Sequence, residues 1–230
     1  MSVFVEAEVW QGKKTVALAR WLIGRHLVRR FPDGHSEARL ITETEAYHGE
    51  TDLACHARAG RTARTDVMYG PGGVWYVYLC YGIHELLNLV VGPPDWPAAI
   101  LIRGVEGASG PGRVTRQLTI DRTLNRQPAT PDAGLWIEDR GVRVPAARVT
   151  ATPRIGVDYA GPVWASKPWR FIVDPRWLAS RPPVLSPAAA TPGPPSLAAP
   201  GPPASAEPST LDRSDRKAGR TSRRPRPQGD

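Results

Sequence analysis

The stretch GPGGVWYVYLCYGIHELLNLVVG, residues 70–92, holds two runs of β-branched, aromatic and aliphatic side chains around a short turn sequence. The first run spans 74–80 and the second spans 86–91. Two such runs joined by a glycine-containing turn are typical of an antiparallel hairpin. The sequence therefore predicts a protruding β-hairpin with Tyr81 and Gly82 at its turn.

The segments that flank this hairpin predict a helix and further strands. Residues 14–29 carry apolar side chains at near-helical spacing, which predicts a helix running into a strand. FPDGHS, at 31–36, is typical of a turn. Residues 37–47 alternate between two sets of side chains, which predicts a strand. The polar side chains that could carry chemistry lie near the C-terminal end of this strand. After the hairpin, 98–106 predicts another strand, which ends near Arg103.

The C-terminal half of the ordered part continues in the same way. A Gly/Pro turn in residues 109–121 opens a short predicted helix. The stretches 134–139, 154–161 and 167–174 are interpreted as strands joined by turns. The expected fold class is therefore α+β: a single mixed domain over residues 1–178, with a curved antiparallel β-sheet, flanking helices and the protruding hairpin.

Residues 179–230 are predicted to be a disordered tail rich in Pro, Ala and Arg. Positions 181–230 contain 12 of the 25 prolines and no aromatic residue, so they cannot bury enough apolar surface to offset the entropy of ordering. They carry eight Lys or Arg against four Asp or Glu, which leaves +4 of the formal charge of +8 for the rest of the chain. Such a surface favours polyanions, although a Pro/Arg tail is more often a solvated spacer than a defined binding element.

Cysteine content and hydropathy indicate the cellular compartment in which we expect the protein. Cys55 and Cys80 are the only cysteines, which is too few for a disulfide framework or a four-thiolate zinc site. The sequence has no long apolar run, and the opening MSVFVEAEVW carries two acids where a signal peptide needs an apolar segment. We therefore expect a soluble cytoplasmic protein with no signal peptide and no membrane partner.

Residues 41–60, ITETEAYHGETDLACHARAG, form an acidic island in this basic chain. Within it, Glu45, Tyr47 and His56 offer a proton acceptor, a flat stacking surface and a switchable donor. Taken singly, a strand-end carboxylate is usually solvated and a histidine is usually structural. A metal site is an alternative, although the candidate ligands follow no recognisable zinc or magnesium spacing. Those candidates are Glu43, Glu45, His48, Asp52, Cys55 and His56.

Aromatic residues dominate the first strand of the predicted hairpin. Alternation along a strand gives Tyr76 and Tyr78 one face and Trp75 the other, and we assign Trp75 to the core. Tyr81 is different, because a large ring at a hairpin turn has little to pack against. An exposed wedge at a turn is a device by which proteins enter a base stack.

Arginines near turn glycines form a third group of candidate functional residues. Clustered arginines with turn glycines suit contacts to phosphate groups. Solvated loop charge is the alternative interpretation. The residues are Arg58, Arg61 and Arg64 in HARAGRTART, and Arg113 after GPG.

Six blocks of the sequence occur in a recognisable order: ETEAYHGETDLACHARAGRT (43–62), YGPGGVWYVYLCYGIHELLNLV (69–90), ILIRGVE (100–106), GPGRVTRQLTI (110–120), RIGVDYAGP (154–162) and KPWRFIV (167–173). Together they resemble the alkyladenine (3-methyladenine) DNA glycosylases of the type shared by mammals and many bacteria. The resemblance covers roughly residues 14–174. The chain departs from that family's pattern at Thr65 and Asp66 after Arg64, at Tyr69 and at the N-terminus.

The resemblance implies excision of alkylated or deaminated purines from duplex DNA by a monofunctional glycosylase that needs no cofactor. By that similarity, Glu45 would be the general base that activates water, and Arg103 would help to hold that water. Tyr81 would fill the gap left in the duplex by the extruded nucleotide. Possible phosphate contacts are Arg61, Arg64 and Arg113.

The resemblance also implies a pocket for the extruded base. Tyr47 on one side, with His56 and Tyr78 on the other, would sandwich the base, and His56 would also reach a phosphate. Asn88 would crowd the exocyclic amine of normal guanine. The expected partner is double-stranded DNA containing damaged purines, bound by a monomer, and no metal is expected in the site.

The lysine content favours a reaction that stops at base release. Glycosylases that also cut the backbone generally need an amine for a Schiff base. The sequence has four lysines, and none lies in a candidate motif. Two other functions remain open: a non-catalytic module that holds damaged DNA in the same groove, and a metal-dependent phosphoesterase that uses the acidic cluster.

Overall fold

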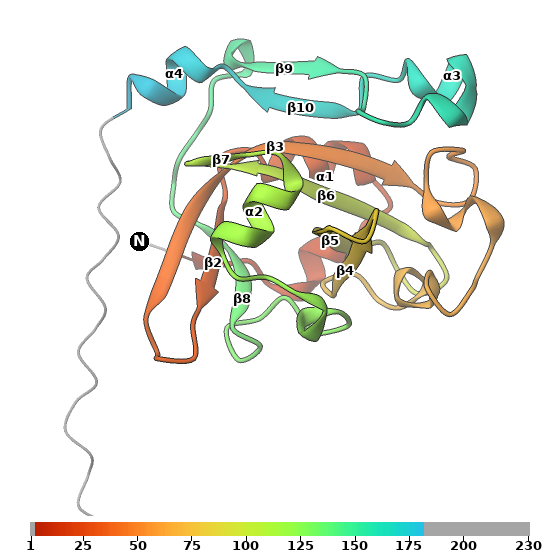
Figure 1. The fold of residues 1–230 in the computed structure, drawn as a ribbon. Coiled ribbons are helices and arrows are strands. Elements are labelled where there is room, and N and C mark those ends of the chain that lie inside the picture. Colours follow the sequence, from red (N-terminus) through yellow and green to blue (C-terminus); the bar gives the residue numbers. More distant parts are fainter. Residues whose placement is uncertain (1–2, 182–230) are drawn as a thin grey trace, which may run out of the picture. The chain divides into compact units, whose positions relative to one another are not determined.

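A computed structural model describes residues 3–181 of the chain (Figure 1). From residue 182 on, the predicted disordered tail lies outside the described residues. Within the described range the chain forms one antiparallel sheet of ten strands, four α-helices and several 3-10 turns. The predicted class, a mixed α+β fold built on an antiparallel sheet, is confirmed.

The strands differ widely in length, and β3 is the longest of those described. Their bounds are β1 Val3–Phe4, β2 His26–Arg30, β3 Ser36–His48, β4 Trp75–Cys80, β5 His84–Val91, β6 Ala98–Val105, β7 Ala108–Ser109, β8 Leu135–Asp139, β9 Val149–Thr152 and β10 Arg170–Val173. The predicted strands over 37–47 and 98–106 therefore correspond to β3 and β6. Those over 134–139 and 167–174 correspond to β8 and β10.

The helices are short, and they include those predicted over 14–29 and 109–121. The α-helices are α1 Thr15–Leu22, α2 Pro111–Gln117, α3 Gly161–Ala165 and α4 Pro175–Ala179. The 3-10 turns are η1 Ala7–Gln11, η2 His56–Ala59, η3 Asp66–Tyr69, η4 Arg122–Leu124, η5 Ala146–Arg148 and η6 Asp158–Ala160. In the part of the chain that the structure describes, no helix has the length and apolar character needed to cross a membrane.

Strand β3 is the element to which most of the sheet attaches. The strand order is β1-β8-β2-β3-β6-β5-β4. The first half of β3 pairs with β2, while its second half pairs with β6 on one edge and with β10 on the other. Strands β9 and β10 lie along β3, with α3 near one end of this pair and α4 near the other (Figure 1). The C-terminal half of β3 therefore has a hydrogen-bonded neighbouring strand on both edges.

Alternation along the strands separates the main core from a second face of the sheet. On β4, Trp75 and Val77 are buried in the main core, whereas Tyr76 and Tyr78 belong to a separate cluster on the other face. The Trp75 ring is fully buried, and its Nε1 donates a hydrogen bond to the Leu135 carbonyl at 2.9 Å. The assignment of Trp75 to the core is confirmed.

The predicted hairpin is formed by β4 and β5. Cys80 pairs with His84, and the Ile83 N–H donates to the Cys80 carbonyl at 3.1 Å. Tyr81 and Gly82 have φ angles of 51° and 70°, and positive φ at two successive residues is typical of type I′ hairpin turns. The Tyr81 side chain is 91% exposed. A large ring held in solvent, on a backbone conformation that disfavours side chains, contributes little to stability, and the role of Tyr81 as a wedge stays a prediction.

The strand predicted over 154–161 is wrong. These residues form a bend, the 3-10 turn η6 and the start of α3. Gly156 and Gly161 have φ angles of 73° and 78°, which no extended strand adopts. The Ile155 N–H and the Arg154 side chain bind groups of β3 instead of a neighbouring strand of a ladder. The short strands β1, β7 and β9 are additions that the sequence did not predict.

His26 on β2 is a buried ionisable group that makes no side-chain hydrogen bond within residues 3–181. The side chain belongs to a residue that is 2% exposed, and neither ring nitrogen has a hydrogen-bond partner among the described residues. Burial, with a smaller effect from the cations of Arg140 and Arg181, lowers the pKa of His26 to about 4. The folded protein therefore keeps this imidazole neutral where an unfolded chain would protonate it.

We expect the free energy of unfolding to fall as the pH drops from about 6.5 toward about 4, because the unfolded chain then binds a proton on His26 that the folded chain does not. Once fully developed, this difference in pKa corresponds to about 3 kcal/mol. Urea unfolding at several pH values measures it. The variant His26→Leu should lose this part of the pH dependence, and the exposed control His35→Leu should keep it. An identical pH dependence in His26→Leu would contradict the assignment.

Candidate active site

One row of directly paired residues crosses the sheet and sets the position of the candidate site. Tyr76 pairs with Asn88, Asn88 with Leu101, Leu101 with Glu45, and Glu45 with Arg170. The five residues come from β4, β5, β6, β3 and β10, and directly paired residues point to the same face of a sheet. A slip of one residue in any pairing would turn that strand's side chains to the other face.

A cavity of about 950 Å³ opens on this face of the sheet. Its size and its mixture of rings and a few charged groups suit a small organic ligand. Of the predicted site residues, Arg61 does not line it. Those that do are Glu45, Arg103, Tyr47, His56, Tyr78, Asn88, Tyr81, Arg64 and Arg113.

Glu45 is fully buried in the wall of this cavity. Its Oε2 accepts a hydrogen bond from the Tyr47 hydroxyl at 2.8 Å, and its Oε1 accepts one from the Ile155 N–H at 2.9 Å. The Nε atoms of Arg103 and Arg170 lie 3.6 Å and 4.0 Å from Oε1. Burial raises the pKa of Glu45, although the charge of Arg103 and the two hydrogen bonds oppose this effect. The carboxylate is therefore a stronger base than an exposed glutamate.

Glu43 lies two residues before Glu45 and shares its cations. The Nε atoms of Arg103 and Arg170 lie 2.9 Å and 2.6 Å from Glu43 Oε1, so both guanidinium groups are closer to Glu43 than to Glu45. Gly104 on β6 faces this carboxylate, and a Cβ at Gly104 would lie 2.9 Å from the Glu43 Cβ. The glycine thus allows the two carboxylates and two guanidinium groups to pack closely.

Aromatic side chains form the walls around Glu45. The His56 and Tyr78 rings meet edge to face, with centroids 4.8 Å apart and planes at 73°. The Tyr76 hydroxyl lies 3.1 Å from His56 Nδ1, and the Tyr76 and Tyr78 ring centroids are 5.2 Å apart. Tyr47 lines the cavity from β3, where its hydroxyl is held by Glu45. The cavity therefore has aromatic groups from three separate segments of the chain.

Asn88 supplies a fixed polar group in the same wall. Its residue is 5% exposed, and its Nδ2 donates to the carbonyl oxygens of Tyr76 and Leu86 at 3.1 Å and 3.4 Å. These two bonds use both N–H groups of the amide. The orientation of the side chain is therefore set by the backbone of the hairpin.

Arg64 and Arg113 bring positive charge to the cavity from different elements. The Arg64 guanidinium lies 4.8 Å from the Tyr78 ring centroid, and its Nε donates to the Tyr76 hydroxyl at 3.3 Å. Arg113 lies on α2 and is exposed. The site thus combines buried carboxylates with cations that are open to solvent.

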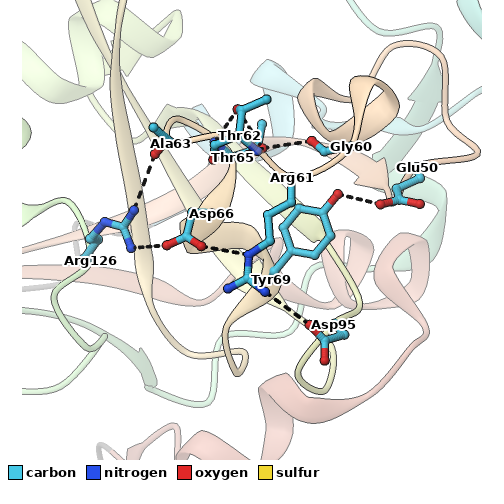
Figure 2. Close-up of polar contacts among 10 residues, drawn as sticks. All are labelled: Glu50, Gly60, Arg61, Thr62, Ala63, Thr65, Asp66, Tyr69, Asp95 and Arg126. Carbon is cyan, nitrogen blue, oxygen red and sulfur yellow. Dashed lines mark hydrogen bonds and ion pairs between the residues drawn. The ribbon is translucent and has the colours of Figure 1, made fainter. Parts of the chain in front are cut away.

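Arg61 belongs to an ion-pair network that fixes the loop around η3 (Figure 2). Its Nε donates to Asp66 Oδ1 at 2.8 Å, and its Nη1 lies 3.6 Å from Asp95. Arg126 binds the other oxygen of Asp66 at 2.8 Å. Asp66, one of the departures from the family pattern, therefore binds two arginines. The role of Arg61 as a phosphate contact stays a prediction, with its charge already matched by two carboxylates.

Several residues that touch the site escaped the sequence reasoning. Ile155 and Arg170 bind or approach Glu45 from the C-terminal part of the chain, more than a hundred residues away. Asp52, considered only as a metal ligand, forms a buried ion pair with Arg154. The signal for these residues lay in the blocks RIGVDYAGP and KPWRFIV, whose partners only the fold reveals. Throughout residues 3–181, no three His, Cys, Asp or Glu side chains gather as metal ligands.

Comparisons with known proteins identify a family for this chain. The sequence profile of the methylpurine-DNA glycosylase family matches residues 9–109 and 106–176, which include every strand that lines the cavity. This chain belongs to the methylpurine-DNA glycosylase family. The resemblance carried by the six sequence blocks is therefore confirmed.

Curated relatives support the family assignment. A protein of Psychrobacter cryohalolentis is 44% identical over 181 residues, covering 66% of this chain and 84% of the relative. Proteins of an Anaeromyxobacter species and of Methanocella arvoryzae are 42% and 43% identical, covering 77% and 69% of this chain and 93% and 87% of the relatives. All three carry the name "Putative 3-methyladenine DNA glycosylase".

We expect His56 to titrate near pH 4, because burial, together with the charges of Arg64 and Arg58, lowers its pKa to about 4. The pH dependence of its imidazole chemical shifts in NMR spectra measures this. Arg64→Gln should raise the midpoint by removing a nearby charge. Arg126→Gln, which alters the network of the same loop, serves as the control and should leave it unchanged. A midpoint near 6.5 would contradict the described environment of the ring.

Proposed function

We propose that this protein is a DNA-repair glycosylase that hydrolyses the N-glycosidic bond of alkylated purines, such as 3-methyladenine and 7-methylguanine, in double-stranded DNA. Family membership and the names of its relatives support this substrate class. The observation that carries the proposal is Glu45, a buried carboxylate in the wall of a cavity lined by aromatic rings and reached by exposed cations. That arrangement suits a cationic ring that arrives attached to a polyanion.

The cavity has to receive a nucleotide that has left the duplex. A base inside the stack hides its glycosidic bond, so the nucleotide rotates outward at a cost of a few kcal/mol. Alkylation of a ring nitrogen gives the purine a positive charge, which favours contact with the faces of Tyr47 and Tyr78. We assign to Asn88, held rigid by the hairpin backbone, the exclusion of normal guanine through its exocyclic amine.

Hydrolysis then needs little more than a water molecule and a negative charge near the sugar. A cationic purine is already a good leaving group, and an ionised carboxylate both orients water and stabilises the positive charge that develops on the sugar. Glu45 supplies this carboxylate. We assign to Arg103, between Glu43 and Glu45, the role of keeping Glu45 ionised and helping to orient the water.

The burial of Glu45 indicates where that water enters. Oε1 is held by the Ile155 N–H and faces Arg103, whereas Oε2 contacts only the Tyr47 hydroxyl among the hydrogen bonds described. The carboxylate has no solvent-exposed surface in this conformation. The water must therefore join or displace the Tyr47 hydroxyl at Oε2 when the nucleotide enters the cavity.

The reaction is proposed to end at base release. Cleavage of the backbone by a glycosylase requires an amine that forms a Schiff base with the sugar. Among the described residues no lysine lines the cavity, and Lys13 and Lys167 lie over the rings of Trp96 and Trp164. Base release without strand cleavage is thus the chemistry that the cavity supports.

Replacing Glu45 by glutamine should leave binding to abasic-site DNA within about threefold and lower the single-turnover rate of base release by about 10²- to 10⁴-fold. The amide keeps the shape of the side chain but cannot act as a base. Glu50→Gln is the control from the same acidic island, because Glu50 binds the Tyr69 hydroxyl and does not line the cavity (Figure 2). In the wild type, the rate should decrease as the pH falls through the raised pKa of Glu45. A Glu45→Gln rate close to the wild-type rate would remove Glu45 from its role.

Replacing Tyr81 by alanine should weaken binding to lesion-containing duplex by roughly 1–3 kcal/mol, the usual loss when one stacked ring is removed. The melting temperature should hardly change, because the ring is 91% exposed. Tyr81→Phe keeps the ring and should bind like the wild type. Electrophoretic mobility shift with abasic-site DNA measures the difference, and equal binding by Tyr81→Ala would argue against a wedge.

The proposed function is tested by a base-release assay on a panel of duplexes with one lesion each. Chromatography should detect free 3-methyladenine and 7-methylguanine, with the strand intact until alkali is added and with no effect of EDTA. Binding without release would favour the non-catalytic module. Loss of activity in EDTA would favour the metal-dependent phosphoesterase. The same panel, with hypoxanthine and ethenoadenine included, defines the lesion preference.

A further inference from the structure

A buried ion pair lies next to the part of β3 that carries Glu45. The side chains of Asp52 and Arg154 are both 0% exposed. Arg154 Nη1 and Nη2 donate to Asp52 Oδ2 and Oδ1 at 2.5 Å and 2.9 Å, which makes the contact bidentate. Neither residue lines the cavity. The pair therefore has no direct access to a ligand in the cavity and can act on one only through neighbouring residues.

The Arg154 guanidinium connects the pair to the strand that carries Glu45. Nη1 also donates to the carbonyl of Ala46, the residue between Glu45 and Tyr47, at 2.8 Å. Its Cζ lies 4.8 Å from the Tyr47 ring centroid and 5.1 Å from that of Trp169. The backbone and the ring next to the carboxylate are thus both held by one side chain.

Asp52 connects the pair to the loop that leads to His56. Its Oδ2 accepts a hydrogen bond from the His48 N–H at 3.0 Å, and its Oδ1 accepts one from the Ala54 N–H at 3.0 Å. The carboxylate therefore ties the end of β3 to the residues just before η2. Tyr47 and His56 both line the cavity, and each lies next to a backbone segment that this pair holds in place.

Arg154 is also the residue before Ile155, whose N–H holds Glu45 Oε1 at 2.9 Å. The backbone is in an open bend here, with Gly156 at φ 73°, so no strand ladder keeps Ile155 in place. The Arg154 side chain anchors this bend to the Ala46 carbonyl of β3 and to Asp52. One end of the Glu45 carboxylate is thus oriented by a hydrogen bond whose donor depends on the buried pair.

Stability alone is a poor reason for such a pair. Taking two charges out of water costs several kcal/mol per ion, and a hydrophobic replacement of the same volume is often no less stable. Arg154 Nε has no hydrogen-bond partner among the described residues, which adds to that cost. A bidentate pair does, however, fix orientation, because the planar guanidinium fits a carboxylate in one arrangement.

We propose that the Asp52–Arg154 pair is a positioning device for the reaction, which fixes the Ile155 N–H on Glu45 Oε1 and the ring of Tyr47 beside Oε2. This inference rests on the proposed function of Glu45 and extends it to two buried residues that do not line the cavity. The pair leaves Oε2 as the oxygen that can exchange the Tyr47 hydroxyl for water. Displacing the bend would let the carboxylate rotate away from the sugar.

The first test replaces Arg154 by lysine, which keeps the charge but loses the bidentate contact. We expect the single-turnover rate of base release to fall about 100-fold, the usual effect of a small misplacement in a catalytic site. Binding to abasic-site DNA should stay within about threefold of the wild type. The matched control is Arg148→Lys, because Arg148 forms an exposed ion pair with Asp174 at 2.9 Å, beside β9 and away from the cavity.

The pH–rate profile separates positioning from a structural role. The hydrogen bond from Ile155 lowers the pKa of Glu45, so its loss should move the acid limb of the profile to higher pH. A general loss of stability would lower the melting temperature without moving that limb. Glu43 on β3, Arg103 on β6 and Arg170 on β10 also face Glu45, and the substitution does not alter them. The Tyr47 hydroxyl on β3 lowers the pKa of Glu45 as well, so a shift of the Tyr47 ring would move the acid limb in the same direction.

A second variant covers the case in which Arg154→Lys does not fold. In Arg154→Gly, added guanidinium ion at millimolar concentration should restore part of the base-release rate, whereas sodium at the same ionic strength should not. A folded Arg154→Lys with the wild-type rate and acid limb would overturn the proposal, as would guanidinium having no effect on a folded Arg154→Gly. If the wild type itself releases no base, the proposed function fails first, and the two failures are distinguished.

Discussion

The buried carboxylates at the C-terminal end of β3 need positive charges and hydrogen-bond donors around them, and the rest of the structure depends on this constraint. Three acids of the sequence's acidic island, Glu43, Glu45 and Asp52, are less than a tenth exposed. Burying an unpaired carboxylate costs far more than a domain can tolerate. The fold meets this cost with arginines from β6, β10 and the bend before η6, so these distant segments must close onto β3 for the chain to fold at all.

The three acids are compensated to different degrees, and this difference gives the site its chemistry. Asp52 has a bidentate arginine and two N–H donors, and Glu43 has two guanidinium groups within 2.9 Å. Glu45 accepts hydrogen bonds from one N–H and one hydroxyl, and the same two guanidinium groups lie farther from it than from Glu43. Burial raises the pKa of Glu45. Under the proposed function, the least compensated acid is the one that faces the cavity and accepts a proton from water.

The parts of this arrangement that depend on local pattern could be predicted from the sequence. Alternation placed Trp75 in the core and Tyr76 and Tyr78 on the other face, and turn chemistry located Tyr81. The bend at 154–161 was mistaken for a strand, because its apolar residues alternate while its conformation depends on two glycines and on the distant Asp52. The ion pairs of Arg61 likewise depend on Asp95, which local pattern does not connect to it. Sequence reasoning therefore named nine of the side chains that line the cavity but not the long-range contacts that orient them.

A crystal structure of the protein with duplex DNA that carries a positively charged pyrrolidine in place of the lesion nucleotide would test the central claim most directly, because such a ring mimics the charge of the transition state. The account predicts that the pyrrolidine, which takes the place of the sugar, lies in the cavity beside Glu45, with an ordered water between it and Glu45 Oε2, and with the Ile155 N–H still bound to Oε1. A nucleotide bound elsewhere, or a Glu45 carboxylate that contacts no water in the filled cavity, would contradict it.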